Sequence, residues 1–318
     1  MNHDILIFSA LADPARIRIL HLLKELELSV GELALVLAQS QSRISKHIKL
    51  LVECGLVERR KEGNWAFLRL GDPALVDPLF DLLERWALVN GRNPWIAADA
   101  ARLTAINAER AAEAAHYFRA HVTEWDKLRS LHVPTQDVDA AILRILADHK
   151  PGRLVDIGTG TGTMLHLFAG RADHMIGIDR SPDMLRYGRA NLAEQGIANA
   201  ELRQGDMNGI DLPSGSADTV ILHQVLHYAH HPAAVIAEAA RLLAPAGRLL
   251  IVDVAPHHHE DLRRDHAHAR LGFTDQEVLE HMKAARLDAR VAEHLTGGAL
   301  TVTIWEGHPE APRLRAVR

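Results

Sequence analysis

The stretch Leu154-Val155-Asp156-Ile157-Gly158-Thr159-Gly160-Thr161-Gly162 decides the fold of the second half of the chain. Its apolar first half is typical of a buried strand, and its three glycines predict a turn whose backbone approaches a ligand closely. A helix is expected next, around residues 164–169. This order predicts an α/β fold of the nucleotide-binding kind. Thr163 stands where a dinucleotide fingerprint has its third glycine, so the spacing disfavours NAD.

Apolar runs alternate with helical segments around this turn, which predicts a mostly parallel sheet flanked by helices. We expect the last two strands to pair as an antiparallel hairpin at the sheet edge, around Gly297-Gly298. The seven expected strands are residues 153–157, 174–178, 200–203, 219–222, 247–252, 289–294 and 300–305.

Polar residues follow the next three strands as well. Asp179 ends the second strand, at roughly the distance from the glycine-rich turn where a carboxylate meets ribose hydroxyls. Asp206-Met207 follows the third strand and His223-Gln224 the fourth. Ligands of open α/β sheets bind outside the carboxyl ends of the strands, so all four loops are expected at one site.

These four ordered motifs make residues 134–305 resemble class I S-adenosylmethionine-dependent methyltransferases, with a Rossmann-like, seven-stranded sheet. The resemblance implies that S-adenosylmethionine or S-adenosylhomocysteine binds at the four loops. A turn or capping role for Asp156 and plain packing for Arg180 and Met184 stay open. The resemblance assigns the methionine part to Asp156, Gly158, Thr159 and Gly160, the ribose to Asp179, the adenine to Arg180, Met184, Asp206 and Met207, and the sulfonium end to His223 and Gln224.

Methyl transfer needs little side-chain chemistry, because the sulfonium is already an excellent leaving group and the protein mainly aligns the reactants. His227 and Tyr228 lie where a base would reach the acceptor, although residues at this turn often only cap a helix. Tyr117 and Trp125 precede the glycine-rich turn and are candidates for a lid over the cofactor, with ordinary packing as the alternative.

A histidine-rich stretch, residues 256–273, follows the fifth strand. Its histidines lack a carboxylate at ligand spacing, so we expect a polar cover over the substrate opening rather than a metal site. No metal site is predicted anywhere in the chain.

The first half of the chain has the signals of a small helical domain. Asp13-Pro14 predicts one helix start, and Ser29 with Glu32 forms a capping box that predicts another. A third helix is expected from about Gln41 to Glu53. Two β-like runs, residues 57–61 and 65–70, surround a Glu-Gly-Asn turn and predict a hairpin. The order predicts a helix-turn-helix followed by a wing.

The third helix is amphipathic, and its polar side together with the hairpin carries the local charge. Residues 41–61 hold six Lys/Arg against two acids, although the whole chain has a net charge of -5. This surface predicts DNA binding, with a merely solvated helix face as the alternative. The candidate DNA-binding residues are Gln41, Ser42, Arg43, Ser45, Lys46, Lys49, Arg59, Arg60 and Lys61.

Residues 11–20, 40–48 and 55–63 carry a strong resemblance to the ArsR/SmtB family of winged-helix repressors. The resemblance implies a homodimer that binds double-stranded DNA. Leu75, Val76, Leu79, Leu82, Leu83 and Trp86 suit either the dimer interface or the domain core. Relatives that sense metals use cysteines or Asp and His on these helices. Here residues 30–37 have no cysteine and residues 73–89 no histidine, so metal sensing is not expected.

The composition fits an intracellular protein of two domains. The chain has 318 residues and one cysteine, Cys54, and no apolar run approaches the roughly 18 residues that cross a bilayer. We expect a cytoplasmic protein with a winged helix-turn-helix at 1–90, a helical connector at 91–133 and a methyltransferase-like domain at 134–318. The predicted fold class is therefore α/β, with a mainly helical N-terminal domain.

Two functions remain open at this point. One is an ArsR-type transcriptional regulator whose fused domain binds S-adenosylmethionine or S-adenosylhomocysteine and methylates a small molecule or only senses the ligand. The alternative is an active small-molecule methyltransferase in which the helix-turn-helix serves mainly dimerisation. Arsenite is disfavoured as the acceptor, because the second domain has no cysteine. The motifs typical of base methylation are also absent from the sequence.

Overall fold

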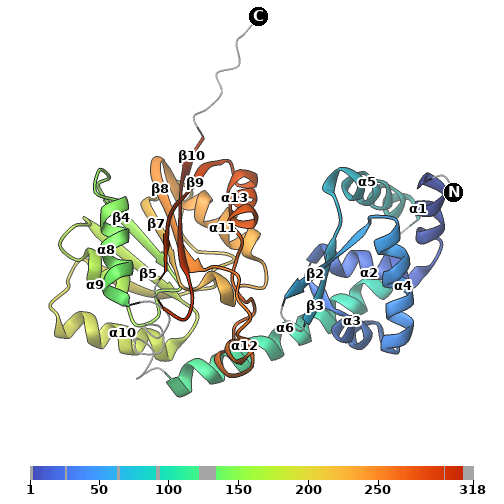
Figure 1. The fold of residues 1–318 in the computed structure, drawn as a ribbon, viewed down its shortest axis with the longest axis horizontal. Coiled ribbons are helices and arrows are strands. Elements are labelled where there is room, and N and C mark those ends of the chain that lie inside the picture. The colour runs from blue at the N-terminus through green and yellow to red at the C-terminus, as the bar shows by residue number, and fades with distance from the viewer. Residues whose placement is uncertain are drawn as a thin grey trace, which may run out of the picture. The chain divides into compact units, whose positions relative to one another are not determined.

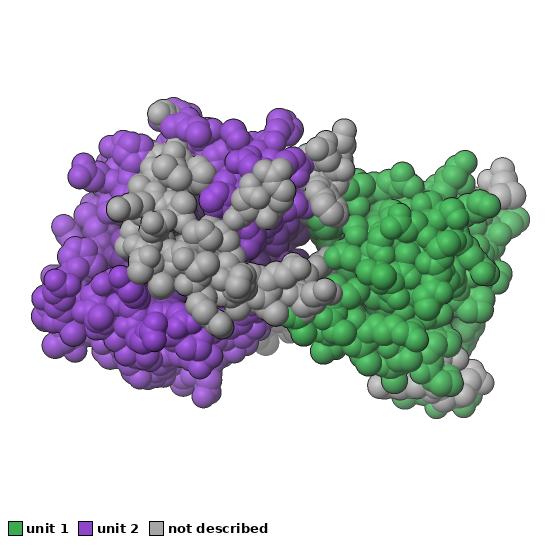
Figure 2. Space-filling model, turned by 90° about the horizontal axis from the view of Figure 1, so that it is seen from below, with its two compact units in different colours: residues 1–113 green, residues 114–318 purple. Residues whose placement is uncertain are grey.

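The computed structural model describes residues 3–25, 27–62, 65–90, 94–121, 134–296 and 298–310. Side chains are described for these residues except 3–4, 60–62, 65, 90, 107, 109–121 and 264–265. The chain forms two compact units, residues 1–113 and 114–318, which Figure 2 colours separately. Each unit is described by itself below.

Unit 1 is mainly helical and contains a three-stranded antiparallel sheet in the order β1-β3-β2 (Figure 1). The capping box predicted at Ser29 is present: the Ser29 side chain accepts from the Glu32 N–H, and the Glu32 carboxylate accepts from the Ser29 N–H. The elements are α1 (His3–Leu11), α2 (Pro14–Glu25), β1 (Leu28–Ser29), α3 (Val30–Leu37), α4 (Gln41–Glu53), β2 (Val57–Glu62), β3 (Trp65–Leu70), α5 (Pro73–Asn90) and α6 (Pro94–His121).

The helix-turn-helix consists of α3 and α4. Helix α3 ends where Ala38 adopts a left-handed conformation, with φ of 53°. Helix α4 covers the range expected from the sequence, and its Ile44, Ile48 and Leu51 are fully buried. Strands β2 and β3 pair antiparallel from Val57↔Leu70 to Glu62↔Trp65, which forms the predicted hairpin.

The first part of α6 packs on the helix-turn-helix. Leu103 joins the hydrophobic core of unit 1. Arg18 of α2 donates two hydrogen bonds to the buried carboxylate of Asp99, at 2.7 and 2.6 Å. Arg102 donates to the carbonyl of Val36 in the last turn of α3, at 3.1 Å. Helix α6 is thus fixed to both α2 and α3.

Unit 2 contains a seven-stranded sheet in the order β6-β5-β4-β7-β8-β10-β9. The first five strands in this order are parallel, and β10 pairs antiparallel with both β8 and β9. The elements are α8 (Thr135–Ile145), β4 (Arg153–Ile157), α9 (Thr163–Phe168), β5 (His174–Asp179), α10 (Pro182–Glu194), β6 (Ala200–Gln204), β7 (Ala217–His223), η1 (Leu226–Tyr228), α11 (Pro232–Leu242), β8 (Leu243–Val254), α12 (Glu260–His266), α13 (Asp275–Ala284), β9 (Leu287–Leu295) and β10 (Val302–Pro309).

Helices cover both faces of this sheet (Figure 1). Leu154, Ile221 and Leu250 belong to a core that includes residues of α8, α9 and α10. The neighbouring residues along the same strands, such as Val155 and Leu249, belong to a second core with α11 and α13. Side chains alternate between the faces of a strand, so a sheet buried on both sides needs the nearly continuous apolar runs of this sequence.

Within the described ranges, none of the helices is both long and apolar enough to cross a membrane. Nor do the described side chains include a group of three histidine, cysteine or acidic residues placed to hold a metal ion.

The ion pair between Arg18 and Asp99 gives a stability prediction. Asp99→Ala leaves the Arg18 guanidinium, whose side chain is 17% exposed, without its carboxylate. We expect the free energy of unfolding to fall by about 1–3 kcal/mol. Urea denaturation of the full chain, followed by circular dichroism, measures this change.

The control is Glu84→Ala, which removes an ion pair to Lys24 whose side chains are 65% and 43% exposed. An exposed pair contributes about 0–1 kcal/mol. Equal effects of the two substitutions would contradict a structural role for Asp99.

Candidate functional site

The carboxyl ends of β4, β5, β6, β7 and β8 lie at one edge of the sheet, because these five neighbouring strands are parallel. The four polar motifs expected from the sequence follow four of these strands. The fold therefore brings the four loops to one edge, as predicted.

The glycine-rich loop has the geometry that its sequence requires. Gly158, Gly160 and Gly162 have φ values of 73°, 54° and 86°, a region that other residues rarely adopt. A Cβ atom on Gly158 would lie 2.1 Å from Cγ2 of Val225, in the loop after β7. The loop after β4 therefore packs directly against the loop after β7, and only glycine fits at position 158.

Asp179 connects the loops after β4 and β5. Its Oδ2 accepts from the N–H of Gly160 at 2.9 Å, and its Oδ1 accepts from the N–H of Ser181 at 2.8 Å. Burial raises the pKa of the Asp179 carboxyl, while these N–H donors act in the opposite direction. Each oxygen has a second lone pair, so the carboxylate can also accept from ligand hydroxyls.

The other residues predicted for the cofactor have varied surroundings. Asp156 is buried at the end of β4, and Thr159 is buried with its Oγ1 toward Gly177. Met184 is buried in α10, and Arg180 is exposed.

Two further residues lie in the loop after β6. Asp206 is exposed and accepts two hydrogen bonds from Asn208, while Met207 packs against the second core of the sheet.

The loop after β7 is strained at Gln224, whose φ is 50°. Its N–H donates to the carbonyl of Val252 in β8 at 2.7 Å. Non-glycine residues in this conformation cost free energy and concentrate at functional sites. His223, which precedes Gln224, is buried. Both predicted residues thus lie at the carboxyl edge.

A polar cluster lies beside this loop, at the ends of β7 and β8. Nδ1 of His227 lies 2.7 Å from Oδ1 of Asp253, and both side chains are buried. The His227 ring stacks on that of His268, with centroids 4.1 Å apart, and Tyr228 lies at the same centroid distance. Arg270 is buried and pairs with Glu277.

Sequence reasoning named His227 and Tyr228 in this cluster but not Asp253, His268 or Arg270 as site residues. Asp253 comes directly after the apolar run 247–252, just as Asp179 comes directly after the apolar run 174–178. An aspartate at the end of an apolar strand is therefore a sequence signal that could have identified Asp253. For Tyr117 the structure describes only the backbone, in α6, and Trp125 lies outside the described residues.

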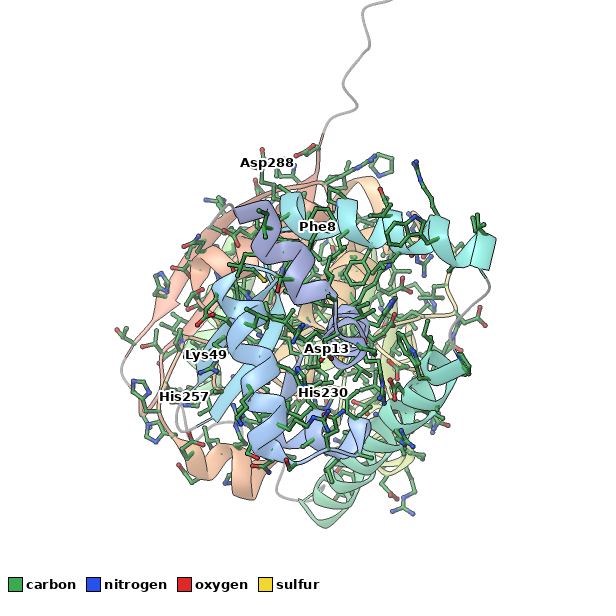
Figure 3. All side chains as sticks on the ribbon, turned by 90° about the vertical axis from the view of Figure 1, so that its right-hand side faces the viewer. Phe8, Asp13, Lys49, His230, His257 and Asp288 are labelled. Carbon is green, nitrogen blue, oxygen red and sulfur yellow. The ribbon has the colours of Figure 1, made fainter. Side chains whose placement is uncertain are left out.

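The predicted DNA-binding residues of α4 share one exposed face, opposite the buried Ile44, Ile48 and Leu51. Lys49 projects from this helix (Figure 3). Arg59 of β2 is also exposed, whereas the side chains of Arg60 and Lys61 lie outside the described residues. All the predicted DNA-binding residues of α4 are exposed, namely Gln41, Ser42, Arg43, Ser45, Lys46 and Lys49.

The fold and these two surfaces define a winged helix-turn-helix protein with a second, Rossmann-like domain. The family model described as "Bacterial regulatory protein, arsR family" matches residues 13–59, and the model "Methyltransferase domain" matches residues 148–303. The arsenical resistance operon repressor of Escherichia coli K12 is 45% identical over 83 residues, which are 25% of this chain and 69% of that protein. The chain belongs to the ArsR family of bacterial regulatory proteins and carries a fused methyltransferase domain.

Two further comparisons concern the second domain. The arsenite methyltransferase of Aquipseudomonas alcaligenes is 28% identical over 173 residues, 45% of this chain and 50% of that protein. The crystal structure of the YcgJ protein from Bacillus subtilis covers 54% of this chain and 98% of its own, with 20% identity and a TM-score of 0.48. The chain spans about half the length, or less, of the first curated relatives that it matches.

The residues of unit 2 fit S-adenosylmethionine, the cofactor of its domain class. At Gly158, Gly160 and Gly162 the loop carries no Cβ atoms, so a ligand can approach its backbone closely. The Asp179 carboxylate lies beside that loop with acceptor capacity left for the ribose hydroxyls.

The glycine-rich loop gives a binding prediction. Gly158→Ala should displace the loop from Val225 and weaken S-adenosylhomocysteine binding at least tenfold, or about 1.4 kcal/mol. Calorimetry measures the affinity. The matched control is Gly170→Ala, where an added Cβ meets nothing within 4 Å. Unchanged affinity in the Gly158 variant would mean that this loop does not border the ligand.

Proposed function

We propose that the chain is a cytoplasmic transcriptional regulator that binds operator DNA as a homodimer and binds S-adenosylmethionine or S-adenosylhomocysteine in its second domain. One observation carries the proposal. The same chain contains an exposed basic helix, α4, and the four loops after β4, β5, β6 and β7 that lie at one edge of the sheet. In this proposal residues 1–90 bind DNA, residues 91–133 connect, and residues 134–318 bind the cofactor.

The DNA surface in this proposal is the exposed side of α4 with the β2–β3 hairpin. Ser and Gln side chains read base edges or contact phosphates, and Lys and Arg neutralise phosphates. The buried side of α4 anchors the helix in the core of unit 1, so its exposed side is held rigidly. The net charge of -5 means that attraction to DNA must come from this local surface.

The homodimer is supported by apolar side chains on α1 and α5. Phe8, Leu88 and Val89 are 66%, 87% and 84% exposed, and Ile5 and Trp86 are more than half exposed. Figure 3 labels Phe8 on α1. Exposed apolar patches of this kind are typical of protein interfaces. By contrast, Val76 and Leu79 are buried in the core of unit 1. From the sequence alone, these two residues suited either the dimer interface or the domain core.

In the cofactor site, the backbone of the loop at Gly158–Gly160 and Asp156 would hold the methionine part, and Asp179 the ribose. Thr159 would contribute its backbone, since its Oγ1 lies toward Gly177. Arg180, Met184, Asp206 and Met207 would border the adenine, and His223 and Gln224 the sulfonium end. Tyr117 and Trp125 would cover the cofactor. The bound cofactor supplies an activated methyl group.

A second candidate function is turnover by the fused domain. The buried pair of His227 and Asp253 favours it, because ligand sensing alone does not require a histidine oriented by a buried carboxylate. The names of two curated relatives include arsenite, but arsenite is disfavoured as the acceptor here. Enzymes for that acceptor rely on several cysteines, and this chain has only Cys54, in unit 1.

DNA binding is tested with Lys46→Ala combined with Lys49→Ala. We expect weaker binding to a duplex that the protein selects from a random pool, with half-sites about one helical turn apart. The slope of log affinity against log salt should become shallower by roughly 4 for the dimer, since each protomer loses two phosphate contacts. Fluorescence anisotropy at several salt concentrations measures both quantities.

The matched control is Lys150→Ala combined with Lys283→Ala, which removes the same charge from exposed positions of unit 2. Equal losses in the two double variants would show that net charge, and not the α4 surface, controls binding.

The regulatory part of the proposal predicts coupling between the two ligands. Helix α6 is fixed to α2 and α3, and its chain continues toward the cofactor domain. We expect S-adenosylhomocysteine to weaken operator binding by about 5- to 150-fold, or 1–3 kcal/mol, and linkage requires DNA to weaken S-adenosylhomocysteine binding by the same factor. Anisotropy without ligand, with S-adenosylmethionine and with S-adenosylhomocysteine at one salt concentration decides this. Three identical binding curves would contradict the sensor hypothesis and would leave the methyltransferase hypothesis standing.

A further inference from the structure

The acid–histidine pair at the ends of β7 and β8 has a defined hydrogen-bond pattern. Asp253 is fully buried, and three nitrogen atoms lie within hydrogen-bond distance of its carboxylate. Oδ1 accepts from the Val254 backbone at 2.8 Å and faces Nδ1 of His227 at 2.7 Å, while Oδ2 accepts from the His227 backbone at 3.2 Å.

This pattern fixes the tautomer of His227. An ionised carboxylate only accepts hydrogen bonds, so the His227 nitrogen that faces it must carry the proton. In the neutral ring, Nε2 then holds the lone pair and is the basic atom. A histidine oriented through Nδ1–H in this way is the arrangement of a general base.

The ring of His227 is also held from its sides. His268 stacks on it at an interplanar angle of 26°, and Tyr228 lies against it at 50°. The backbone N–H of Arg270 donates to the His227 carbonyl at 3.0 Å. Asp253 of β8 and His268 therefore contact the imidazole from two other parts of the chain, and Arg270 fixes the backbone of His227.

The pair lies beside the proposed cofactor loops. Gln224, three residues before His227, is bonded to Val252, the residue before Asp253. In open α/β sheets this carboxyl edge is where ligands meet. A base at this point lies at the same edge of the sheet as the proposed cofactor loops.

We propose that His227 is the general base for an acceptor that presents a phenolic hydroxyl, with Asp253 as its positioning residue. This inference rests on the proposed binding of S-adenosylmethionine. The acceptor O–H bond breaks and its proton goes to Nε2 of His227. The oxygen forms a bond to the methyl carbon, and the carbon–sulfur bond breaks with its electron pair going to sulfur. The products are the methyl ether, neutral S-adenosylhomocysteine and an imidazolium held by Asp253.

Two observations favour a phenol over an amine as the acceptor in this proposal. The rings of Tyr228 and His268 beside His227 suit a flat aromatic acceptor. An ammonium acceptor needs a carboxylate partner, but Asp253 is engaged by His227 and Val254, and Glu277 is engaged by Arg270. A phenol requires only the loss of one proton, which is what the pair provides.

The first test compares two phenols in the full chain with labelled S-adenosylmethionine at pH 9. There 4-nitrophenol is already ionised, whereas 4-cresol is not. His227→Gln should lower kcat for 4-cresol by about 10²- to 10⁴-fold. It should change kcat for 4-nitrophenol less than tenfold, because no proton remains to be removed. The control, His174→Gln, changes an exposed histidine at the amino end of β5 and should affect neither.

The second test needs no turnover. Nitrogen-15 NMR of the full chain saturated with S-adenosylhomocysteine should show the Nδ1–H tautomer of His227, assigned by its loss in His227→Gln. In Asp253→Asn this signature should disappear, because an amide has one acceptor oxygen for three N–H donors. Asp253→Glu, which keeps the carboxylate, should restore part of it.

The outcomes separate this inference from the proposed function. The inference is overturned if wild-type His227 is the Nε2–H tautomer, if His227→Gln slows both phenols equally, or if neither phenol is methylated while S-adenosylhomocysteine binds. Methylation of arsenite or of an amine, with no phenol accepted, overturns it as well. Absence of S-adenosylhomocysteine binding in calorimetry on the same samples overturns the proposed function instead.

Discussion

The parallel pairing of β4, β5, β6, β7 and β8 is the constraint on which the site in unit 2 depends. Parallel strands place their carboxyl ends together, and backbone hydrogen bonds then hold the loops after β4, β6 and β7 to a neighbouring strand. The Gly158 N–H donates to the Ile178 carbonyl, the Gly205 N–H to Asp179, and the Gln224 N–H to Val252. The sheet hydrogen bonding thus continues into the first residues of these loops and holds their backbone against the strands.

The helix α6 has a comparable role in unit 1. A helix that is rich in alanine has little apolar surface of its own with which to dock. The bidentate pair of Arg18 and Asp99 and the bond from Arg102 to Val36 provide directed contacts instead. Because Val36 lies in the last turn of α3, α6 contacts the helix-turn-helix next to the turn that leads to α4. A change in the position of α6 would therefore act on the recognition helix through a short path.

The sequence predicted most of the fold because its signals are local. The apolar runs marked all seven strands to within a few residues, and the capping box at Ser29 marked the start of α3. The cluster around His227 was only partly predictable, since His268 lies 41 positions further along the chain and its stacking depends on how the segment after β8 folds back. The strained φ of Gln224 has no sequence signature either, because strain is imposed by the neighbouring strands.

The distribution of sulfur and imidazole in the chain bears on what the two domains respond to. Cys54 is buried, its thiol donates to the Leu51 carbonyl, and burial raises the pKa of that thiol, so a reactive thiolate is disfavoured there. Unit 2 has no cysteine but places His227 against a buried carboxylate. Soft-metal chemistry needs thiolates, whereas proton removal from a hydroxyl needs an oriented imidazole. The side chains present in unit 2 therefore fit the proposed removal of a proton from an organic hydroxyl better than they fit the binding of a soft metal.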